Sequence, residues 1–187
     1  WGFIDKTGRE IIPSKYGYPG SFSENLASVL IGGKSVFIDK TGRTVLKPKY
    51  EMSFGFSEGL ASVQFNGKWG FMDKTGGEVI TPKYEIVLGF SEGFAVVMLG
   101  GKFGFIDKTG REIAAPKYDN LGGFKDGFAF VRTGDKWGFI DKKGDEIVPV
   151  KYEKLWCLAF IKKGFFGVVS NGKKCFVDLE GNEYCDF

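Results

Sequence analysis

The sequence contains no histidine, only three cysteines and only six prolines in its 187 residues. The absence of histidine excludes an imidazole base, a Cys–His pair and a histidine metal ligand. An excess of one charge is also lacking, because 26 Lys and Arg stand against 23 Asp and Glu, a formal net charge of +3. That near balance gives no electrostatic reason to expect nucleic acid as a partner. No apolar run approaches the roughly 18 residues of a membrane-spanning helix, so no membrane span is predicted.

Glycine and phenylalanine are abundant, with 29 and 20 copies, and both follow an internal repeat. The phrase Trp-Gly-Phe-Ile-Asp-Lys-Thr-Gly begins at residue 1 and returns with changes at 35, 69, 103 and 137, a period of 34 residues. A partial, irregular copy begins near residue 174, after an insertion of three residues between Tyr152 and Gly172. We therefore predict a single repeat array over residues 1–187, cut from a longer array.

Each repeat predicts a three-stranded antiparallel meander. In the third copy, Asn66-Gly67 separates two alternating apolar runs, the pattern of a two-residue hairpin turn. The next turn, Asp73-Lys74-Thr75-Gly76, is typical of a type I turn whose Asp accepts backbone N–H groups. A loop of about ten residues is expected to lead to the next meander. Fixed glycines and alternating apolar residues argue against helical repeats of the same period.

The hairpin register predicts which residues share a sheet face. Counting from the second turn places Phe71 opposite Val79 and Gly70 opposite Ile80. Both faces are then apolar, so each sheet needs cover on both sides, and neighbouring repeats are the expected cover. The glycine at the second position of the phrase is expected to let a neighbour's aromatic side chain approach. The aromatic row at the first position is expected in the core: Trp1, Trp69, Phe103 and Trp137.

The fold class predicted is all-β, with meanders stacked as an open solenoid-like superhelix or arc. A propeller-like ring is the alternative. The open form is favoured because the chain begins at the second strand of a meander and ends after the third strand of another. A ring commonly completes one blade with strands from both chain ends.

The run Lys-Trp-Gly-Phe-Ile-Asp-Lys-x-Gly-x-Glu-Ile, with Pro-Lys-Tyr and Phe-Ser-Glu-Gly-Leu-Ala-x-Val after it, resembles the bacterial WG-repeat family, also called KWG repeats. The resemblance covers essentially the whole chain. The Trp-Gly pair is replaced by Ser35-Val36, Phe103-Gly104 and Lys174-Cys175 in three copies. The resemblance implies a β-repeat array of bacterial type that binds other molecules, and it brings no catalytic residue.

Rows of charged residues admit two interpretations each. Six aspartates recur at the turn: Asp5, Asp39, Asp73, Asp107, Asp141 and Asp178. Calcium takes six to eight oxygen ligands, and each of these turns offers at most one further acid, so we expect turn capping. Three rows of lysines could form a track for a polyanion, but rows of Glu and Asp accompany them. A mutually compensated surface is the preferred interpretation.

All three cysteines lie in the irregular last copy. The hairpin register places Cys175 directly opposite Cys185, at a position where side chains approach closely. A cross-strand disulfide is one hypothesis, and two reduced, buried cysteines are the alternative. A disulfide would favour an exported protein.

Candidate binding residues lie where the copies differ, after the recurring tyrosine. A constant frame with variable loops is how repeat scaffolds form recognition surfaces, although such residues can also fill gaps between sheets. The function predicted is a non-enzymatic scaffold without cofactor or metal that binds a protein partner. A glycan-binding, adhesin-like module and a structural spacer or filament subunit are the alternatives. The candidate residues are Tyr18, Met52, Phe54, Leu88, Leu121 and Trp156.

Overall fold

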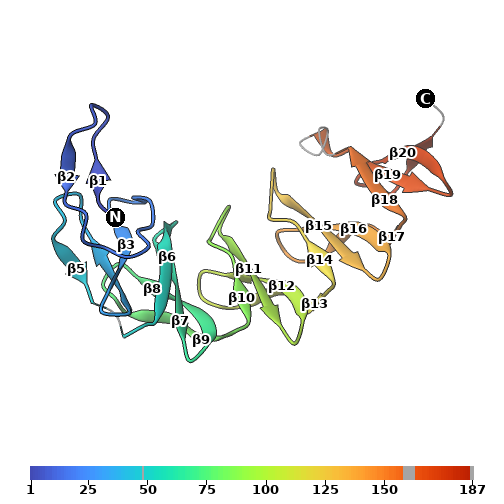
Figure 1. Cartoon of the computed structure of the whole chain (residues 1–187). Coiled ribbons are helices and arrows are strands. Elements are labelled where there is room, and N and C mark those ends of the chain that lie inside the picture. Colours follow the sequence, from blue (N-terminus) through green and yellow to red (C-terminus); the bar gives the residue numbers. More distant parts are fainter. Residues whose placement is uncertain (48, 158–162, 186–187) are drawn as a thin grey trace. The chain divides into compact units, whose positions relative to one another are not determined.

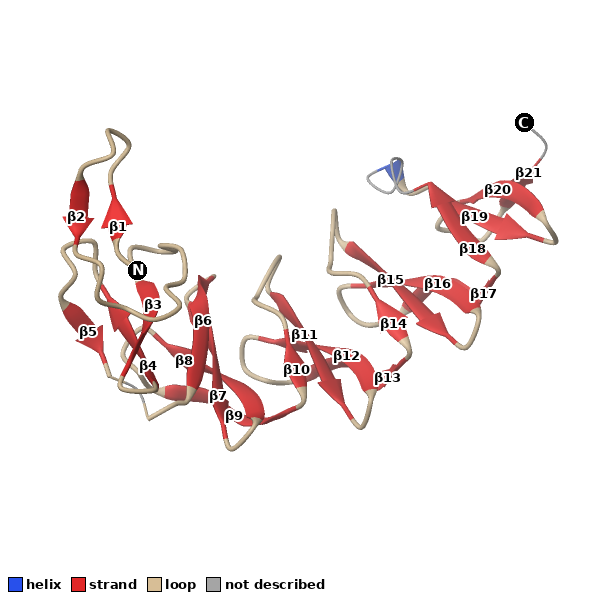
Figure 2. Cartoon of the chain, in the orientation of Figure 1, coloured by secondary structure: helices blue, strands red, loops and turns tan. Residues whose placement is uncertain are grey.

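The computed structural model describes residues 1–47, 49–157 and 163–185, and it is built from β-strands. Contacts divide the chain into two compact units, one of Trp1–Gly93 with Lys108–Gly110 and one of Phe94–Asp107 with Arg111–Phe187. No α-helix occurs in the described ranges, and Figure 2 shows their strands joined by turns and loops, with one short 3-10 segment at residue 163. The all-β prediction is confirmed. No helix in the described part of the chain is long and apolar enough to span a membrane. Part of the predicted three-residue insertion lies outside the described residues.

The first unit contains ten strands (Figure 1). They are β1 (Phe3–Ile4), β2 (Glu10–Ile12), β3 (Ala27–Ile31), β4 (Lys34–Ile38), β5 (Thr44–Leu46), β6 (Met52–Ser57), β7 (Leu60–Phe65), β8 (Lys68–Asp73), β9 (Glu78–Tyr84) and β10 (Ile86–Val87). Strands β1 and β2 form a two-stranded sheet, β3 to β5 a three-stranded sheet, and β6 to β9 a four-stranded sheet, each in chain order.

The second unit contains the remaining strands of the described chain. They are β11 (Phe94–Leu99), β12 (Lys102–Asp107), β13 (Glu112–Tyr118), β14 (Asn120–Leu121), β15 (Phe128–Thr133), β16 (Lys136–Asp141), β17 (Glu146–Tyr152), β18 (Lys154–Cys157), β19 (Phe166–Ser170), β20 (Lys173–Val177) and β21 (Glu183–Cys185). Strands β11, β12 and β13 pair antiparallel in that order. Strands β14 to β17 and β18 to β21 each form a four-stranded sheet in chain order.

Each predicted meander is present, and a short additional strand precedes most of them. The loop expected after Tyr118 contains β14, which pairs antiparallel with β15. The Asp119 N–H donates to the Arg132 carbonyl at 2.8 Å, and the Gly122 N–H donates to the Phe130 carbonyl at 3.1 Å. The residues after the tyrosine are therefore part of the next sheet.

The register across the first hairpin turn is as predicted. Across the second turn the prediction is right for Met72 and Glu78 and wrong for the pairs farther from the turn. Val63 lies opposite Gly70, as expected, and Met72 lies opposite Glu78. A β-bulge then places Phe71 opposite Ile80 instead of Val79. The extra residue turns Val79 toward solvent and buries both members of the new pair.

A second bulge explains the glycine that follows the tryptophan. A Cβ at Gly70 would lie 2.2 Å from the Ile80 oxygen and 2.6 Å from the Pro82 nitrogen. A Cβ at Gly138 would likewise lie 2.5 Å from the Val148 oxygen. The glycine therefore admits the backbone of the third strand of its own sheet, which corrects the expectation that it admits a neighbour's aromatic ring.

The core is formed by the phenylalanine at the third position of the phrase and by the recurring tyrosine, both almost fully buried. The rows are Phe37, Phe71, Phe105 and Phe139, and Tyr16, Tyr50, Tyr84, Tyr118 and Tyr152. Neighbouring sheets supply the contacts: Phe37 of β4 lies 5.0 Å from Phe56 of β6 between ring centroids. The expectation that the row at the first position of the phrase is core is wrong for its tryptophans, whereas Phe103 packs against the core that contains Phe105. Trp1 is 76% exposed, and Trp69 and Trp137 are half-buried.

The Phe-Ser-Glu phrase joins successive copies within the first unit. The Ser23 hydroxyl donates to the Phe56 carbonyl at 2.5 Å, and Ser57 donates to Phe90 in the same way. The Glu24 carboxylate accepts the Gly59 N–H at 3.0 Å and pairs with Lys74 at 2.8 Å. The residues joined by these hydrogen bonds are 33 to 35 positions apart, which is about one repeat. The phrase therefore specifies how one sheet meets the next.

Candidate binding surface

The predicted binding residues occupy different environments in the two units. In the first unit, Tyr18, Met52, Phe54 and Leu88 are all exposed. In the second unit, Trp156 is 37% exposed, whereas Leu121 packs against the core that contains Val131. Leu121 therefore fills a gap, as the alternative interpretation held, and the others are available for contact.

Met52 and Phe54 lie together on the sheet of β6 to β9. Met52 is opposite Gln64, which is opposite Trp69, so these residues form one row across three strands. A bulge between Ser53 and Phe56 allows Phe54 to lie over the row. Its ring stacks on Trp69 with 5.0 Å between centroids and 5° between planes. Phe54 is 54% exposed, so this pair presents a flat apolar surface to solvent.

The same repeat position is occupied differently in the sheet of β14 to β17. Gly122 stands where the first unit has Phe54, and a Cβ there would lie 2.2 Å from the ring of Phe130. Phe130 takes up the vacated space, with its ring centroid 5.7 Å from that of Trp137. The Arg132 guanidinium lies 5.4 Å from the Trp137 ring centroid, a cation–π distance.

The sheet of β18 to β21 carries a third pair. Trp156 is the counterpart of Phe54, and its ring lies 4.9 Å from that of Phe176. Lys174, at the tryptophan position, holds its ammonium 5.3 Å from the Trp156 ring centroid. The Trp156 indole N–H donates to the Cys175 carbonyl at 3.0 Å, which orients the ring. We refer to Phe54–Trp69, Phe130–Trp137 and Trp156–Phe176 as the aromatic pairs.

Sequence reasoning found Phe54 and Trp156 but missed the partly buried rings of Trp69, Trp137 and Phe176, and it missed Phe130, which packs against the core that contains Phe139. A signal for one of them was present. The copy with Gly122 has Phe130 where two other copies have Ser62 and Val96. A small residue and a large one exchanged within a repeat indicate that both positions fill one space.

The aspartate row caps turns, as predicted. The Asp73 carboxylate accepts the Thr75 N–H at 2.8 Å, the Thr75 hydroxyl at 2.6 Å and the Gly77 N–H at 3.0 Å. The hydrogen bond from the Thr75 hydroxyl contributes most to lowering the pKa of Asp73 below its ordinary value. All three bonds go to the same carboxylate oxygen, Oδ1.

Many of the recurring lysines are paired with acids of the same or a neighbouring copy. Lys151 lies 3.0 Å from Glu183, and the Tyr152 hydroxyl donates to the same carboxylate at 2.9 Å. Lys49 and Tyr50 contact Glu78 in the same arrangement, at 3.6 and 3.2 Å. Burial and then the Glu78 charge raise the pKa of Tyr50 to about 12. The compensated surface is present at these positions.

A cluster of three buried serines occupies the site where the second copy lacks tryptophan. Ser35 is almost fully buried, and its hydroxyl hydrogen-bonds those of Ser28, at 2.9 Å, and Ser53. The Ser28 hydroxyl also lies 3.0 Å from the Ser53 carbonyl and donates to it. The three hydroxyl groups satisfy one another in place of an indole ring.

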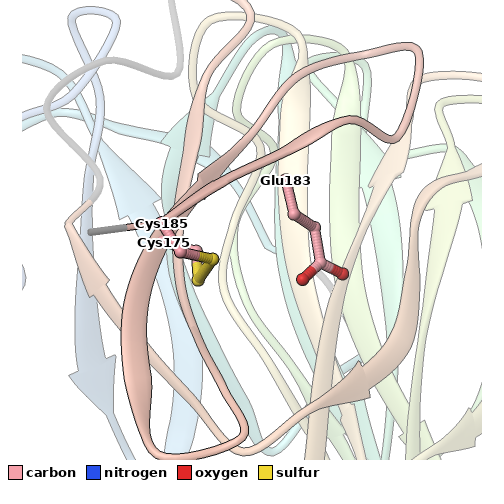
Figure 3. Close-up of side chains that lie close together, drawn as sticks. All are labelled: Cys175, Glu183 and Cys185. Atoms are coloured by element: carbon pink, nitrogen blue, oxygen red, sulfur yellow. A yellow bond between two sulfur atoms is a disulfide. The ribbon is translucent and has the colours of Figure 1, made fainter.

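Figure 3 shows the group in the described chain that comes nearest to a metal site, Cys175, Cys185 and Glu183. Cys175 lies opposite Cys185 in the β20–β21 register, and the two are joined by a disulfide. Bonded sulfurs are not thiolate ligands, and Lys151 and Tyr152 already contact the Glu183 carboxylate. In this state the group offers a metal no complete ligand set. Cys157 is a free thiol.

Similarity to a solved structure extends to the general fold alone. A structure described as KlHsv2 with loop 6CD replaced by a Gly-Ser linker, of the β-propeller type, is 10% identical with a TM-score of 0.51, covering 91% of this chain and 68% of its own. The extracellular domain of the putative one-component system BT4673 from B. thetaiotaomicron is 12% identical, with a TM-score of 0.40 over 90% of this chain and 28% of its own. No curated protein matches the chain significantly.

The family comparison is more specific than these likenesses. The repeat described as WG containing repeat matches five times, over residues 1–34, 37–69, 69–103, 103–137 and 137–173. These matches follow the first five 34-residue copies, and they include the fourth copy with its Phe103-Gly104 pair. The chain belongs to the family of WG-repeat proteins.

Proposed function

We propose that this chain is a non-enzymatic repeat scaffold that binds a protein partner through its aromatic pairs. The observation that supports the proposal most is positional. Phe54 and Trp156 occupy the same place in the 34-residue period, and Phe130 takes up that place where the sequence has Gly122. Each of these three sheets therefore carries one ring pair, so the same kind of contact is offered more than once along the chain.

The chemistry of the pairs suits protein recognition. Tryptophan, tyrosine and arginine dominate the energetics of protein interfaces, because a large rigid side chain buries much area at little entropic cost. Trp69 and Trp137 supply the indole rings, and Arg132 adds a guanidinium beside the second. The recurring polar residues support a non-catalytic role, since the aspartates cap turns and many glutamates pair with lysines.

A comparison of two triple variants tests the proposal. The first variant, Met52→Ser, Phe54→Ser and Trp156→Ser, removes exposed apolar contacts at the aromatic pairs. The matched control is Ile11→Ser, Val45→Ser and Leu179→Ser, which removes three comparably exposed apolar side chains elsewhere. Circular dichroism and chemical denaturation first establish that both variants fold.

Partners captured by the wild-type chain from the extract of its source are then purified and titrated. We expect the first variant to weaken binding at least about tenfold and the control by less than about twofold. Equal binding by both variants would contradict the proposal. A glycan array is run in parallel, because stacked rings also suit sugar faces. Saturable glycan binding that only the first variant loses would replace the protein partner with a carbohydrate.

A further inference from the structure

The second copy contains a groove beside the position where its sequence departs from the repeat. It has a volume of about 510 Å³ and lies on the sheet of β3 to β5. The groove is lined by Ile31, Lys34, Val36, Thr44, Lys47 and Lys49. Its volume falls within the range of about 300–1,000 Å³ common for small-molecule sites.

Val36 explains why the groove exists. It stands at the position of Gly70, where a Cβ would meet the Ile80 oxygen of the third strand at 2.2 Å. With a valine in place, the third strand cannot approach the middle strand as closely. Accordingly β5 contains three residues and ends at Leu46, whereas β9 contains seven. The groove lies beside Val36 and is lined further along the chain by Thr44, Lys47 and Lys49.

Two further substitutions give the groove its charge. Thr44 replaces the glutamate that the third copy has as Glu78, and Lys47 replaces Thr81. Three lysines therefore line the groove, and no acid lines it. Lys49 pairs with Glu78 at 3.6 Å, but no ion pair joins Lys34 or Lys47 to any residue in the described ranges.

A pocket in the second unit shows what the regular pattern produces at the corresponding lysines. This pocket of about 260 Å³ is lined by Lys136 and Lys151, the counterparts of Lys34 and Lys49, together with Glu153 and Glu183. Glu183 contacts Lys151 as Glu78 contacts Lys49, so this lysine is compensated in both places. The groove of the second copy differs in its other lysines, because Lys34 and Lys47 form no ion pair within the described ranges.

We propose that this groove binds a small organic anion, a carboxylate or phosphate ester with a short apolar body. The ammonium groups of Lys34 and Lys47 meet the anionic group, and Ile31 and Val36 provide the apolar floor. Lysine is a common ligand of phosphate and carboxylate groups, acting as a compact point charge. The proposal is independent of the aromatic pairs, none of which lines the groove.

Phenyl phosphate, benzoate and phenol are the probes, titrated into the full chain and followed by two-dimensional amide NMR. We expect saturable shifts at Lys34, Val36 and Thr44 with at least one anion and affinity at least about tenfold weaker for neutral phenol. Inorganic phosphate is the fourth probe. If it binds the same residues as tightly as phenyl phosphate, the apolar floor takes no part and the proposal is wrong.

Variants that restore the regular repeat locate the site. Thr44→Glu with Lys47→Thr is expected to weaken phenyl phosphate or benzoate binding at least about tenfold. Val36→Gly leaves the charge unchanged and is expected to abolish binding by closing the groove. The control is Lys143→Thr, which also replaces a lysine with the residue of another copy, Thr75. Absence of saturable binding, or equal weakening by the control, would overturn the proposal.

Discussion

The indole ring of Trp69 lies flat against the phenyl ring of Phe54, with 5° between the two planes. The residue that names the repeat thus faces outward and is covered by a side chain of the variable segment. The buried position belongs to Phe71, two residues later, which has no exposed surface. The repeat therefore separates an interior aromatic row from a surface row on the same strand.

This separation predicts unequal costs of truncation. We expect Phe71→Ala to lower the free energy of unfolding by about 3–5 kcal/mol, because it empties a fully buried site. Trp69→Ala is expected to cost only about 1–2 kcal/mol, since it removes one half-buried stacked ring. Chemical denaturation of both variants measures the difference. A larger loss for Trp69→Ala than for Phe71→Ala would show that the tryptophan belongs to the core.

The close approach at Gly70 predicts a strong dependence on a single methyl group. Gly70→Ala would bring Cβ to 2.2 Å from the Ile80 oxygen, and a backbone atom cannot move aside cheaply. We expect a loss of about 1–3 kcal/mol in denaturation. Gly17→Ala is the control, because its nearest atom would be the Leu30 Cβ at 3.8 Å. Its free energy of unfolding should change by less than about 0.5–1 kcal/mol.

The contacts of Glu24 predict a pH-dependent junction between copies. The hydrogen bond from Lys74 and then that from the Gly59 N–H lower the pKa of Glu24 below its ordinary value of 4.5. A carboxyl whose folded pKa is depressed stabilises the fold above its unfolded pKa, and the stabilisation is lost as the pH falls through the folded pKa. We therefore expect the stability difference between wild type and Glu24→Gln to be present at pH 7 and to shrink below pH 4.5. Denaturation curves of both proteins at pH 7 and below pH 4.5 measure this stability difference. A difference that does not shrink at the lower pH would contradict the role of the charge.

The cysteines predict a defined alkylation pattern. The non-reduced protein should take up one iodoacetamide, at Cys157, and the reduced, unfolded protein should take up three, as intact mass will show. A disulfide with a sequence separation of 10 constrains the unfolded chain, so Cys175→Ser with Cys185→Ser is expected to cost roughly 2–3 kcal/mol. Three modified cysteines without reductant would show that the native chain is reduced.

Much of the fold follows from local chemistry and could be predicted. The Asn66-Gly67 turn has positive φ at both residues, as a two-residue hairpin requires. The bulge that moves Ile80 opposite Phe71 could not be predicted by counting from the turn, because it depends on how Gly70 admits the third strand. The open superhelix and the ring both stay predictions.

Only part of the candidate surface could be predicted, because packing between strands cannot be read along the chain. Variation among copies identified Phe54 and Trp156, since it can be read along the chain. It could not show that Leu121 packs inward or that Phe130 takes up the space above Gly122. Those outcomes depend on which side chain of two neighbouring strands fills the space that both can reach.

The sequence by itself determined the period, the turns and the aspartate caps, because each depends on hydrogen bonds and backbone angles within about four residues. Only the tertiary structure decided which aromatic row is buried and where a groove opens. Both depend on backbone that lies ten residues or more away along the chain and is close only after folding. Val36 illustrates the difference. In the sequence it is one departure from the repeat, and in the folded sheet it lies among the three lysines that line a groove.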